Sequence, residues 1–389
     1  MIRIEDKKEC TGCGACKNAC SIDAIDLKED EDGFRYPVVN PQKCVNCGKC
    51  VKVCPMYPGA NPIPSENREY TCEFYAGQLF DKEKLLEVSS GGAFLAFAKV
   101  VLDRNGIVYG VEQVDVDRIH HIRITDKTEI QRIQRSKYLQ SDVGICYSMV
   151  RKDLLNNKTV LFSGTGCQIA ALNQFLGKEY ENLYTCDVVC HGVPSMLAWR
   201  QFRKELEEKT GKRMKALVFR DKSAGWSKNQ YKIDYTDGTC EKVRSTEHIF
   251  HSGYLQGLFY RPSCGSCHFA SIPRVSDVTL ADYWRYTGKF HGNEHDMGVS
   301  LIVVNNHKGK HLLEFAREYL DVEETSRELA LSSCKHLDEN PTENINRAAF
   351  LQELKEKGYY AAAQKYIVVS SEKKSYLHKV LAKIKRMVR

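Results

Sequence analysis

Eight cysteines within the first 54 residues constrain this chain more than any other feature of its sequence. They form two runs with the same spacing, Cys-x2-Cys-x2-Cys-x3-Cys, and Pro55 follows the second run. Chains with this repeated spacing hold two [4Fe–4S] clusters, and the fourth cysteine of each run ligates the cluster of the other run. One predicted ligand set is therefore Cys10, Cys13, Cys16 and Cys54. The other predicted set is Cys44, Cys47, Cys50 and Cys20.

A zinc module is the alternative for this region, because Cys-x2-Cys pairs also bind structural zinc. Two complete four-cysteine runs favour iron and sulfur instead. Gly12 and Gly14 in the first run, and Gly48 in the second, let backbone amides approach the sulfurs. The first run has Ser21 where a proline is usual, and this change leaves its ligand in place. We therefore expect an α+β ferredoxin-like cluster domain over residues 1–60.

The composition fits a reducing compartment. The chain has 389 residues and 17 cysteines, an odd number that cannot all pair. In reducing surroundings, cysteines more often bind metals than form disulfides. The first ten residues are charged throughout, unlike a signal peptide, and no apolar run approaches the ~18 residues of a spanning helix. We therefore predict a cytoplasmic protein.

The net charge of +7 is concentrated at the C-terminus. Residues 373–389 contain seven lysines and arginines and no acidic residue, so the rest of the chain is balanced and predicts no nucleic-acid partner. Residues 346–389 are predicted to be a helical segment with this basic tail. The apolar residues of the tail form one helical stripe, namely Leu377, Val380, Leu381, Ile384, Met387 and Val388. The stripe fits either packing on the protein's own core or peripheral contact with an anionic membrane.

Between these ends the chain alternates β-rich and helical segments. This alternation predicts an α/β domain with a mixed sheet over residues 76–345, after a proline-rich linker at 61–75. The elements expected in this domain are helices at 92–106, after an Asp142 N-cap and after Ser195, a strand at 107–111, and a hairpin that turns at Asp237-Gly238.

The segment from Thr159 to Gly177 has the strand, glycine turn and helix of a dinucleotide-binding loop. Its first two glycines fit the fingerprint, but Ile169 occupies the position of the third. Asp187 lies at the spacing of a ribose-binding acid, although it falls within an apolar strand. Cys167 occupies the place where the backbone would approach a pyrophosphate, and this favours a different use of the loop.

The cysteines outside the two runs divide into two groups. Cys264 and Cys267 flank a glycine in a tight turn, which favours a chelating pair. Cys167 and Cys190 each lie beside a glycine turn and are candidate partners in a third metal site, whose fourth ligand is either Cys186 or Cys190. The remaining cysteines are expected to pack in the core, namely Cys72, Cys146, Cys240 and Cys334.

Seven motifs give the chain a family resemblance. They are SSGGAFLAFAKVVLDRNGIVYGV, RSKYLQSDVG, LFSGTGCQIAALNQFLG, CDVVCHGVPS, FRDKSAGWS, YRPSCGSCHFA and SDVTLADYWRY. With them, the sequence resembles the coenzyme F420 hydrogenase/dehydrogenase β-subunit family, in the form that carries an N-terminal two-[4Fe–4S] ferredoxin domain. Two departures from the family pattern are mild, since Gly166 replaces a proline and Ala281 replaces a glycine.

The resemblance implies an iron–sulfur, flavin-dependent oxidoreductase that contains FAD and a third [4Fe–4S] cluster. The metal ligands that it adds are Cys167, Cys190, Cys264 and Cys267. The cofactor-binding residues that it implies are Ser90, Gly91, Gly92, Gly164, Thr165, Gln168 and Asp282. It also implies catalytic roles for Lys137 and His191, for which a solvated lysine and a core histidine are the alternatives. Backbone amides at a helix start suit a diphosphate, which is the physical argument for the turn at Ser90.

The predicted activity is electron transfer between the ferredoxin-type clusters and FAD, and then to or from a small-molecule acceptor. That acceptor is expected to be coenzyme F420 or another ring substrate. The alternative is an electron-transfer subunit that relays electrons to a partner enzyme and has no substrate of its own. Both interpretations require a redox partner protein or a ferredoxin.

Overall fold

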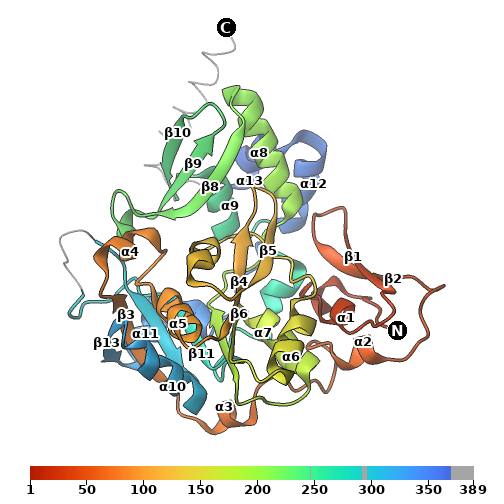
Figure 1. Ribbon diagram of the computed structural model, residues 1–389. Coiled ribbons are helices and arrows are strands. Elements are labelled where there is room, and N and C mark those ends of the chain that lie inside the picture. Colours follow the sequence, from red (N-terminus) through yellow and green to blue (C-terminus); the bar gives the residue numbers. More distant parts are fainter. Residues whose placement is uncertain (246, 291–295, 369–389) are drawn as a thin grey trace.

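An eight-stranded mixed sheet forms the centre of the molecule (Figure 1). The computed structural model describes residues 1–245, 247–290 and 296–368. Across the sheet, the strands are β13 (Leu320–Thr325), β3 (Glu73–Leu79), β12 (Ser300–Val304), β11 (Val278–Asp282), β7 (Leu183–Val188), β6 (Val160–Thr165), β4 (Ile107–Gln113) and β5 (Ile119–Ile124). The expected α/β domain with a mixed sheet is confirmed.

Five of these strands run in the same direction. β4, β6, β7 and β11 are parallel neighbours, and β3 shares their direction because both β3 and β11 are antiparallel to β12. The carboxyl ends of these strands therefore emerge at one edge of the sheet, where ligands of open α/β sheets commonly bind.

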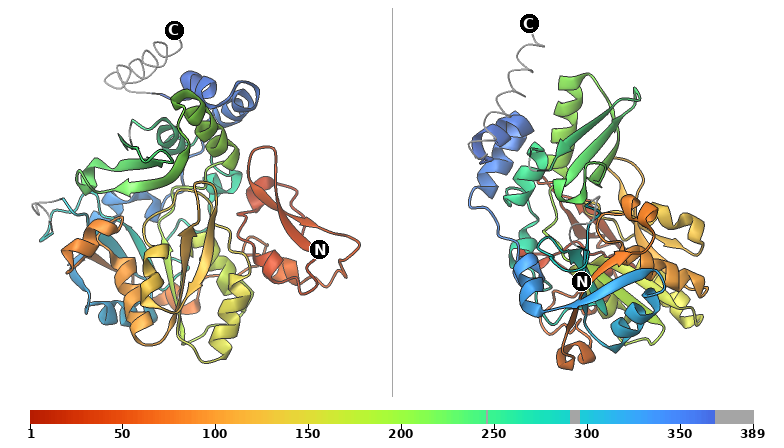
Figure 2. Two further views of the ribbon diagram at one scale, coloured as in Figure 1. Left: turned by 45° about the horizontal axis from the view of Figure 1, so that its top comes forward. Right: turned by 90° about the vertical axis from the view of Figure 1, so that its left-hand side faces the viewer.

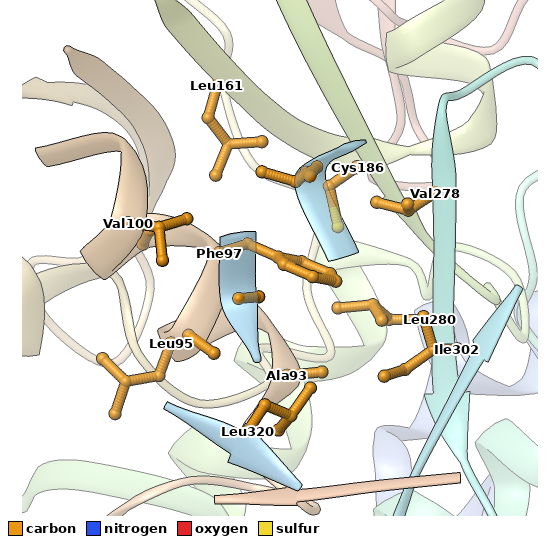
Figure 3. Close-up of a cluster of buried hydrophobic side chains, with 14 of the residues drawn as sticks. Ala93, Leu95, Phe97, Val100, Leu161, Cys186, Val278, Leu280, Ile302 and Leu320 are labelled. Atoms are coloured by element: carbon orange, nitrogen blue, oxygen red, sulfur yellow. The ribbon is translucent and has the colours of Figure 1, made fainter. Parts of the chain in front are cut away.

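Helices cover both faces of the sheet. α5 (Ala93–Asp103) and α10 (His307–Ala316) pack on one face, where the ring of Phe97 is fully buried among strand residues (Figure 3). α6 (Cys146–Leu155), α7 (Gly166–Leu176) and α11 (Arg327–Ser333) cover the other face. The central strands are buried on both faces, which explains why their sequences are continuous apolar runs rather than alternating ones.

A smaller three-stranded sheet and four helices surround an aromatic core beside the large sheet (Figure 1). Its elements are β8 (Met214–Asp221), β9 (Gln230–Tyr235), β10 (Cys240–Arg244), α8 (Met196–Thr210), α9 (Ile249–Leu255), α12 (Arg347–Lys357) and α13 (Tyr359–Tyr366). The hairpin between β9 and β10 is confirmed. Ser195 is the N-cap of α8, since its hydroxyl accepts from the amide of Ala198 at 3.0 Å.

The expected N-cap at Asp142 is wrong. α6 begins four residues later, at Cys146, because Gly144 takes a φ of +57° between them. Asp142 instead accepts from the amide of Gly144 at 2.9 Å and pairs with Arg35 of the N-terminal domain at 2.5 Å. A carboxylate that appeared to start a helix therefore joins two domains.

The N-terminal residues form a small α+β unit, as expected. β1 (Ile25–Glu29) pairs antiparallel with β2 (Arg35–Val39). α1 (Ala15–Asn18) and α2 (Lys49–Lys52) each start at a glycine in the left-handed region, Gly14 and Gly48, so the two cysteine runs have the same local geometry. The remaining short elements are α3 (Ser65–Glu69), α4 (Lys82–Glu87), η1 (Lys7–Glu9), η2 (Lys127–Ile133), η3 (Trp226–Lys228), η4 (Pro262–Ser266) and η5 (Lys335–Leu337).

The N-terminal unit packs on one side of the large domain (Figure 2). Gly33, with a φ of +84°, lies so close to α8 that a Cβ atom would be 2.2 Å from the amide nitrogen of Leu197. The carbonyl of Gly33 accepts from Met196 at 3.2 Å. In the expected linker, Asn67 is buried and donates to the carbonyls of Arg274 and Ser276. The domain boundaries themselves stay a prediction.

None of the helices in the described ranges is long and apolar enough to cross a membrane. The basic tail at 373–389, to which the membrane hypothesis refers, lies outside the described residues.

Replacement of Phe97 tests the packing of α5 on the sheet. Phe97→Ala is expected to lower the free energy of unfolding by about 3–5 kcal/mol, because the ring is fully buried and its removal leaves a cavity. Phe80→Ala is the matched control, since that ring is exposed, and its effect should stay within about 0.5 kcal/mol. Anaerobic urea titration of both variants measures the difference, and equal losses would contradict the assignment of Phe97 to the core.

Candidate functional site

Four cysteines of the first predicted set surround a small cavity. Cys10, Cys13, Cys16 and Cys54 all line it. Burial raises the pKa of Cys13 to about 12, and the neighbouring Cys10 and Cys54 thiols raise it further. Four converging thiols around one cavity are the donor set of a [4Fe–4S] cluster, so these residues fit that group. We refer to them as the Cys10 site.

The second predicted set, the Cys44 site, consists of Cys44, Cys47, Cys50 and Cys20. Backbone amides approach two of its sulfurs, with Ile2 N at 3.3 Å from Cys50 Sγ and Ala24 N at 3.2 Å from Cys20 Sγ. Such N–H to sulfur bonds are typical of iron–sulfur ligands. Cys47 is exposed, so the Cys44 site lies at the surface of the molecule.

Four further cysteines come together at the carboxyl edge of the large sheet, and we refer to them as the Cys167 site. Cys167 lies in the first turn of α7, directly after β6, and Cys190 follows the neighbouring strand β7. Cys264 and Cys267 lie in and directly after η4. Parallel neighbouring strands deliver the first two thiols to the same edge, and the η4 turn supplies the other two.

The charges of these four thiols act on one another. Burial raises the pKa of Cys190 to about 12, with Cys264 and Cys267 as the thiols that raise it further. Cys264 likewise has its pKa raised to about 12 by burial, with contributions from Cys167 and Cys267. For the pKa of Cys167, burial is the largest cause of the increase and is followed by Cys267 and Cys190. Mutual repulsion of this kind disfavours four free thiolates, and metal coordination relieves it.

Hydrogen bonds to the sulfurs accompany this convergence. The amide of Gly192 donates to Cys190 Sγ at 3.4 Å, and the amide of Val193 donates to Cys264 Sγ at the same distance. The hydroxyl of Thr165 lies 3.2 Å from Cys167 Sγ. The donor set therefore fits a third cubane cluster, with Thr165 as a neighbour of its sulfur ligand.

Cys186 does not belong to this group. It lies on β7 and points into the apolar core among Phe97, Val278 and Leu280 (Figure 3). Its pKa is raised by burial and then by the acidic residues Asp187 and Asp277, and by no other thiol. Cys146 is also buried, whereas Cys240 is exposed on the hairpin, so for Cys240 the expectation of a core position is wrong.

Two side chains join the Cys10 site to the Cys167 site. The hydroxyl of Tyr147 is 3.1 Å from the carbonyl of Cys13 and 3.1 Å from the carbonyl of Gln168, the neighbour of Cys167. Arg261 donates to the carbonyl of Cys10 at 2.7 Å, and its own carbonyl accepts from the amide of Cys264 at 2.9 Å. Cys13 is moreover among the thiols that raise the pKa of Cys167. The two sites are therefore direct neighbours.

A polar region at the same sheet edge contains several of the predicted cofactor residues. The amide of Ser136, next to Lys137, donates to the hydroxyl of Ser89 at 2.7 Å. Buried Lys222 donates to the carbonyl of Ser90 at 2.5 Å and to that of Met297 at 2.7 Å. The structure thus brings the SSGG turn and the RSK segment together at the end of β8.

Asp282 belongs to the same region. It pairs with buried Arg220 at 2.9 Å and accepts from the indole of Trp226 at 3.2 Å. The charges of Asp282 and Arg220 also act on Lys222, whose pKa burial lowers to about 7. Burial likewise lowers the pKa of Lys137 to about 7. This region therefore holds two lysines whose charge changes near neutral pH.

Aromatic rings connect this polar region to the Cys167 site. The ring centroids of His191 and Tyr254 are 5.5 Å apart, and those of Tyr254 and Tyr138 are 6.0 Å apart. Tyr138 adjoins Lys137 in sequence, and His191 adjoins Cys190. His191 has no hydrogen-bond partner for its buried Nε2 atom among the described residues, and burial lowers its pKa to about 4.

The glycine turn after β6 is organised by its own side chains. Thr165 and Gln168 form a capping box at the start of α7. Gln168 is buried and also donates to Ser141 at 3.0 Å. Gly166 packs against Phe269, where a Cβ atom would be 3.1 Å from the Phe269 Cβ. The predicted cofactor roles of Gly164, Thr165 and Gln168 remain predictions, and the structure gives Gln168 protein partners.

Asp187 has a structural role rather than that of a ribose-binding acid. It is fully buried and pairs with Arg274, and it accepts from Ser276 at 2.6 Å and from Thr279 at 2.5 Å. These contacts hold the segment before β11 against β7.

Several polar residues of these sites received no role from the sequence, namely Tyr147, Arg220, Lys222 and Arg261. Arg220 and Lys222 lie in the FRDKSAGWS motif, and Arg261 lies three residues before Cys264. Charged residues inside otherwise apolar motifs were the available signal.

Comparisons with known proteins agree with this geometry. Residues 157–328 match the model of a family described as the C terminus of the coenzyme F420 hydrogenase/dehydrogenase beta subunit, and residues 9–57 match that of a 4Fe-4S dicluster domain. A solved structure of the F420-reducing [NiFe] hydrogenase complex from Methanosarcina barkeri contains a similar chain, with 14% identity and a TM-score of 0.45. The match covers 74% of this chain and 93% of that one.

The curated relatives match the N-terminal region. The B-type component of the Na(+)-translocating ferredoxin:NAD(+) oxidoreductase complex of Acetobacterium woodii is 50% identical over 46 residues, which are 12% of this chain and 13% of that protein. A ferredoxin-like protein in the nif region of Sinorhizobium fredii is 43% identical over 54 residues, 12% of this chain and 77% of that protein. The chain thus carries a 4Fe-4S dicluster domain at 9–57 and belongs, through residues 157–328, to the coenzyme F420 hydrogenase/dehydrogenase β-subunit family of oxidoreductases.

Proposed function

We propose that this protein is an iron–sulfur flavoprotein oxidoreductase. It passes electrons between an external redox protein and a small-molecule acceptor, such as coenzyme F420 or another ring substrate, with three [4Fe–4S] clusters and FAD as its cofactors. The observation that carries this proposal is the convergence of Cys167, Cys190, Cys264 and Cys267 directly beside the Cys10 site.

The third cluster is assigned to these four thiols, with Cys190 rather than Cys186 as the fourth ligand. Support comes from the mutual electrostatic effects of the four and from the apolar surroundings of Cys186. Clusters of this type exchange single electrons at potentials that the protein tunes by hydrogen bonds and burial. Tyr147 and Arg261 hold the ligand loops of the Cys10 and Cys167 sites in contact, which keeps the distance between the two sites short.

The FAD site is assigned to the region of Ser90, Lys137 and Asp282. α5 begins at Gly92 without a side-chain cap, and Lys137 uses its ammonium for one carbonyl, that of Gln134. Backbone amides at a helix start and a partly buried cation both suit the phosphates of a dinucleotide. When bound, a flavin supplies exchange of both hydride and single electrons.

Arg220 holds Asp282 in place in this region, while Lys222 fixes the backbone of the SSGG turn. Lys137 is proposed to hold the negative charge of the cofactor or of the reduced substrate. His191 lies between the Cys167 site and the ring of Tyr254, which places its imidazole on the side of this region that faces the cluster.

The Cys44 site is proposed to receive the redox partner. Cys47 is exposed, and the nearby side chains of Val45 and Tyr57 are 71% and 54% exposed. Apolar side chains around an accessible electron-transfer site suit a transient protein contact. The Acetobacterium woodii relative is named as part of a complex, and this favours the second candidate function, a subunit that relays electrons to a partner enzyme. Bound FAD that reduces a diffusible acceptor separates the two.

The metal content of Cys190 and Cys186 variants tests the third cluster. The wild-type protein, purified anaerobically, should contain about twelve iron atoms and one flavin per chain. Cys190→Ala is expected to lose about four iron atoms, whereas the matched Cys186→Ala variant keeps all of them because its thiol lies in the apolar core. Chemical iron and sulfide assays with flavin absorbance measure all three proteins. About eight iron atoms, the content of two clusters, and no flavin in the wild type would refute the proposal.

The pH dependence of FAD binding tests Lys137. Its pKa is about 7 in the protein without ligand, and a bound anion favours the protonated form. FAD affinity should therefore be constant below about pH 7 and fall above it, by at most about tenfold per pH unit, the limit for one proton. Lys137→Met should weaken binding and flatten the profile. Flavin fluorescence quenching in flavin-free protein gives the affinities.

Lys84→Met is the control for this experiment, since Lys84 is exposed and pairs with Glu87. It should reproduce the wild-type profile. A wild-type profile in the Lys137→Met variant would show that another group carries the pH dependence.

A further inference from the structure

Arg261 is a fully buried cation without a carboxylate partner. Its side chain is 0% exposed, and it forms no salt bridge with any residue that the structure describes. The two other buried arginines both have such a partner, since Arg220 pairs with Asp282 and Arg274 pairs with Asp187. An isolated charge inside a protein is costly unless an opposite charge compensates it. Arg261 therefore needs a source of negative charge that the side-chain carboxylates do not supply.

The contacts of Arg261 point toward the Cys10 site. Its Nη2 atom lies 3.7 Å from Cys10 Sγ and 2.8 Å from the carbonyl of Arg35, while Nε donates to the carbonyl of Cys10 at 2.7 Å. The guanidinium also lies over the ring of Tyr36, at 4.4 Å from its centroid. Carbonyl and ring contacts satisfy the N–H groups, but they carry no full negative charge.

Gly12, between Cys10 and Cys13, makes this approach possible. A Cβ atom at Gly12 would lie 2.8 Å from Nη1 of Arg261, so a larger residue would push the guanidinium away from the ligand loop. On its other side, the backbone of Arg261 accepts from the amide of Cys264, and its charge lowers the pKa of the Cys264 thiol against the effect of burial. Arg261 thus lies between the ligands of two cluster sites.

We propose that Arg261 is the counter-cation of the Cys10 cluster, and to a smaller extent of the third cluster, and that it raises their reduction potentials. Four thiolates give a [4Fe–4S] cluster a net negative charge that increases by one on reduction. A fixed cation beside a ligand sulfur stabilises the reduced state more than the oxidised state, because potentials follow net charge and hydrogen bonding at the sulfurs. The role at the third cluster rests on the function proposed above; the role at the Cys10 cluster does not.

EPR-monitored redox titration of the anaerobically purified full-length protein tests this role. Arg261→Gln is expected to lower the equilibrium constant for one-electron reduction of the Cys10 cluster about tenfold, which is about 59 mV in potential. The third cluster should shift in the same direction by less. Arg261→Lys keeps the charge and should stay near the wild-type potential. The signal that is lost in Cys13→Ala identifies the Cys10 cluster.

Arg347→Gln is the matched control, because Arg347 lies at a similar distance from Phe34 but already has Glu343 as a partner. Its potentials should equal those of the wild type. Unchanged potentials in Arg261→Gln, or equal shifts in the glutamine and lysine variants, would overturn the proposal.

Iron content covers the case in which Arg261→Gln does not assemble its cluster. Retention of iron and potential in Arg261→Lys then supports the role of charge, and loss of iron in both variants shows a role for the hydrogen-bonding fork alone, which overturns it. A wild-type protein that lacks the third cluster or FAD would refute the proposed function and leave the measurement at the Cys10 cluster intact.

Discussion

The buried ion pair between Asp187 and Arg274 is the contact on which the Cys167 site depends. Both side chains are inaccessible to solvent, and Asp187 also binds the hydroxyls of Ser276 and Thr279. Removal of one partner from such a pair costs about 3–5 kcal/mol, because the other charge is left uncompensated. The pair fixes the segment before β11 onto β7, and the ligand loops extend from these two segments: Cys190 follows Asp187, and Cys267 precedes Arg274.

The same pair also contributes to the electrostatics of the ligands. The charge of Arg274 lowers the pKa of both Cys190 and Cys267, against the larger effect of burial, which raises it. Structural and chemical roles are therefore combined in one residue. At the Cys10 site, Arg261 combines them in the same way, since it joins two ligand loops by hydrogen bonds while it places a positive charge beside a sulfur.

Much of the fold and part of the site could be predicted from the sequence, where the signal was local. The repeated cysteine spacing, the glycine turn before Cys167 and the N-cap at Ser195 are each determined by a few neighbouring residues. Asp142 shows the limit, since a good capping residue was used for an ion pair with Arg35, a residue more than a hundred positions away. Propensity is a weak guide wherever a tertiary contact competes for the same side chain.

The choice between Cys186 and Cys190 shows the same limit. The two cysteines lie four residues apart, and only the end of β7 at Val188 separates a thiol in the apolar core from one in the ligand loop. Arg261 and Lys222 could not be assigned either, because their partners are backbone carbonyls of remote segments, which leave no mark in the sequence.

The close packing of Gly33 on α8 has a consequence for how electrons cross between domains. Some redox proteins carry a cluster on a domain that swings between a donor and an acceptor, and their turnover then follows the viscosity of the solvent. Here the hairpin that contains Gly33 lies against the amide of Leu197, and Ser195 donates to the carbonyl of Asp32 at 2.5 Å. With Arg261 and Tyr147 inserted at the other end of the contact, the N-terminal domain is anchored at two separated places. Electron passage in this molecule is then a matter of tunnelling across a gap of constant width, with no domain excursion to slow it.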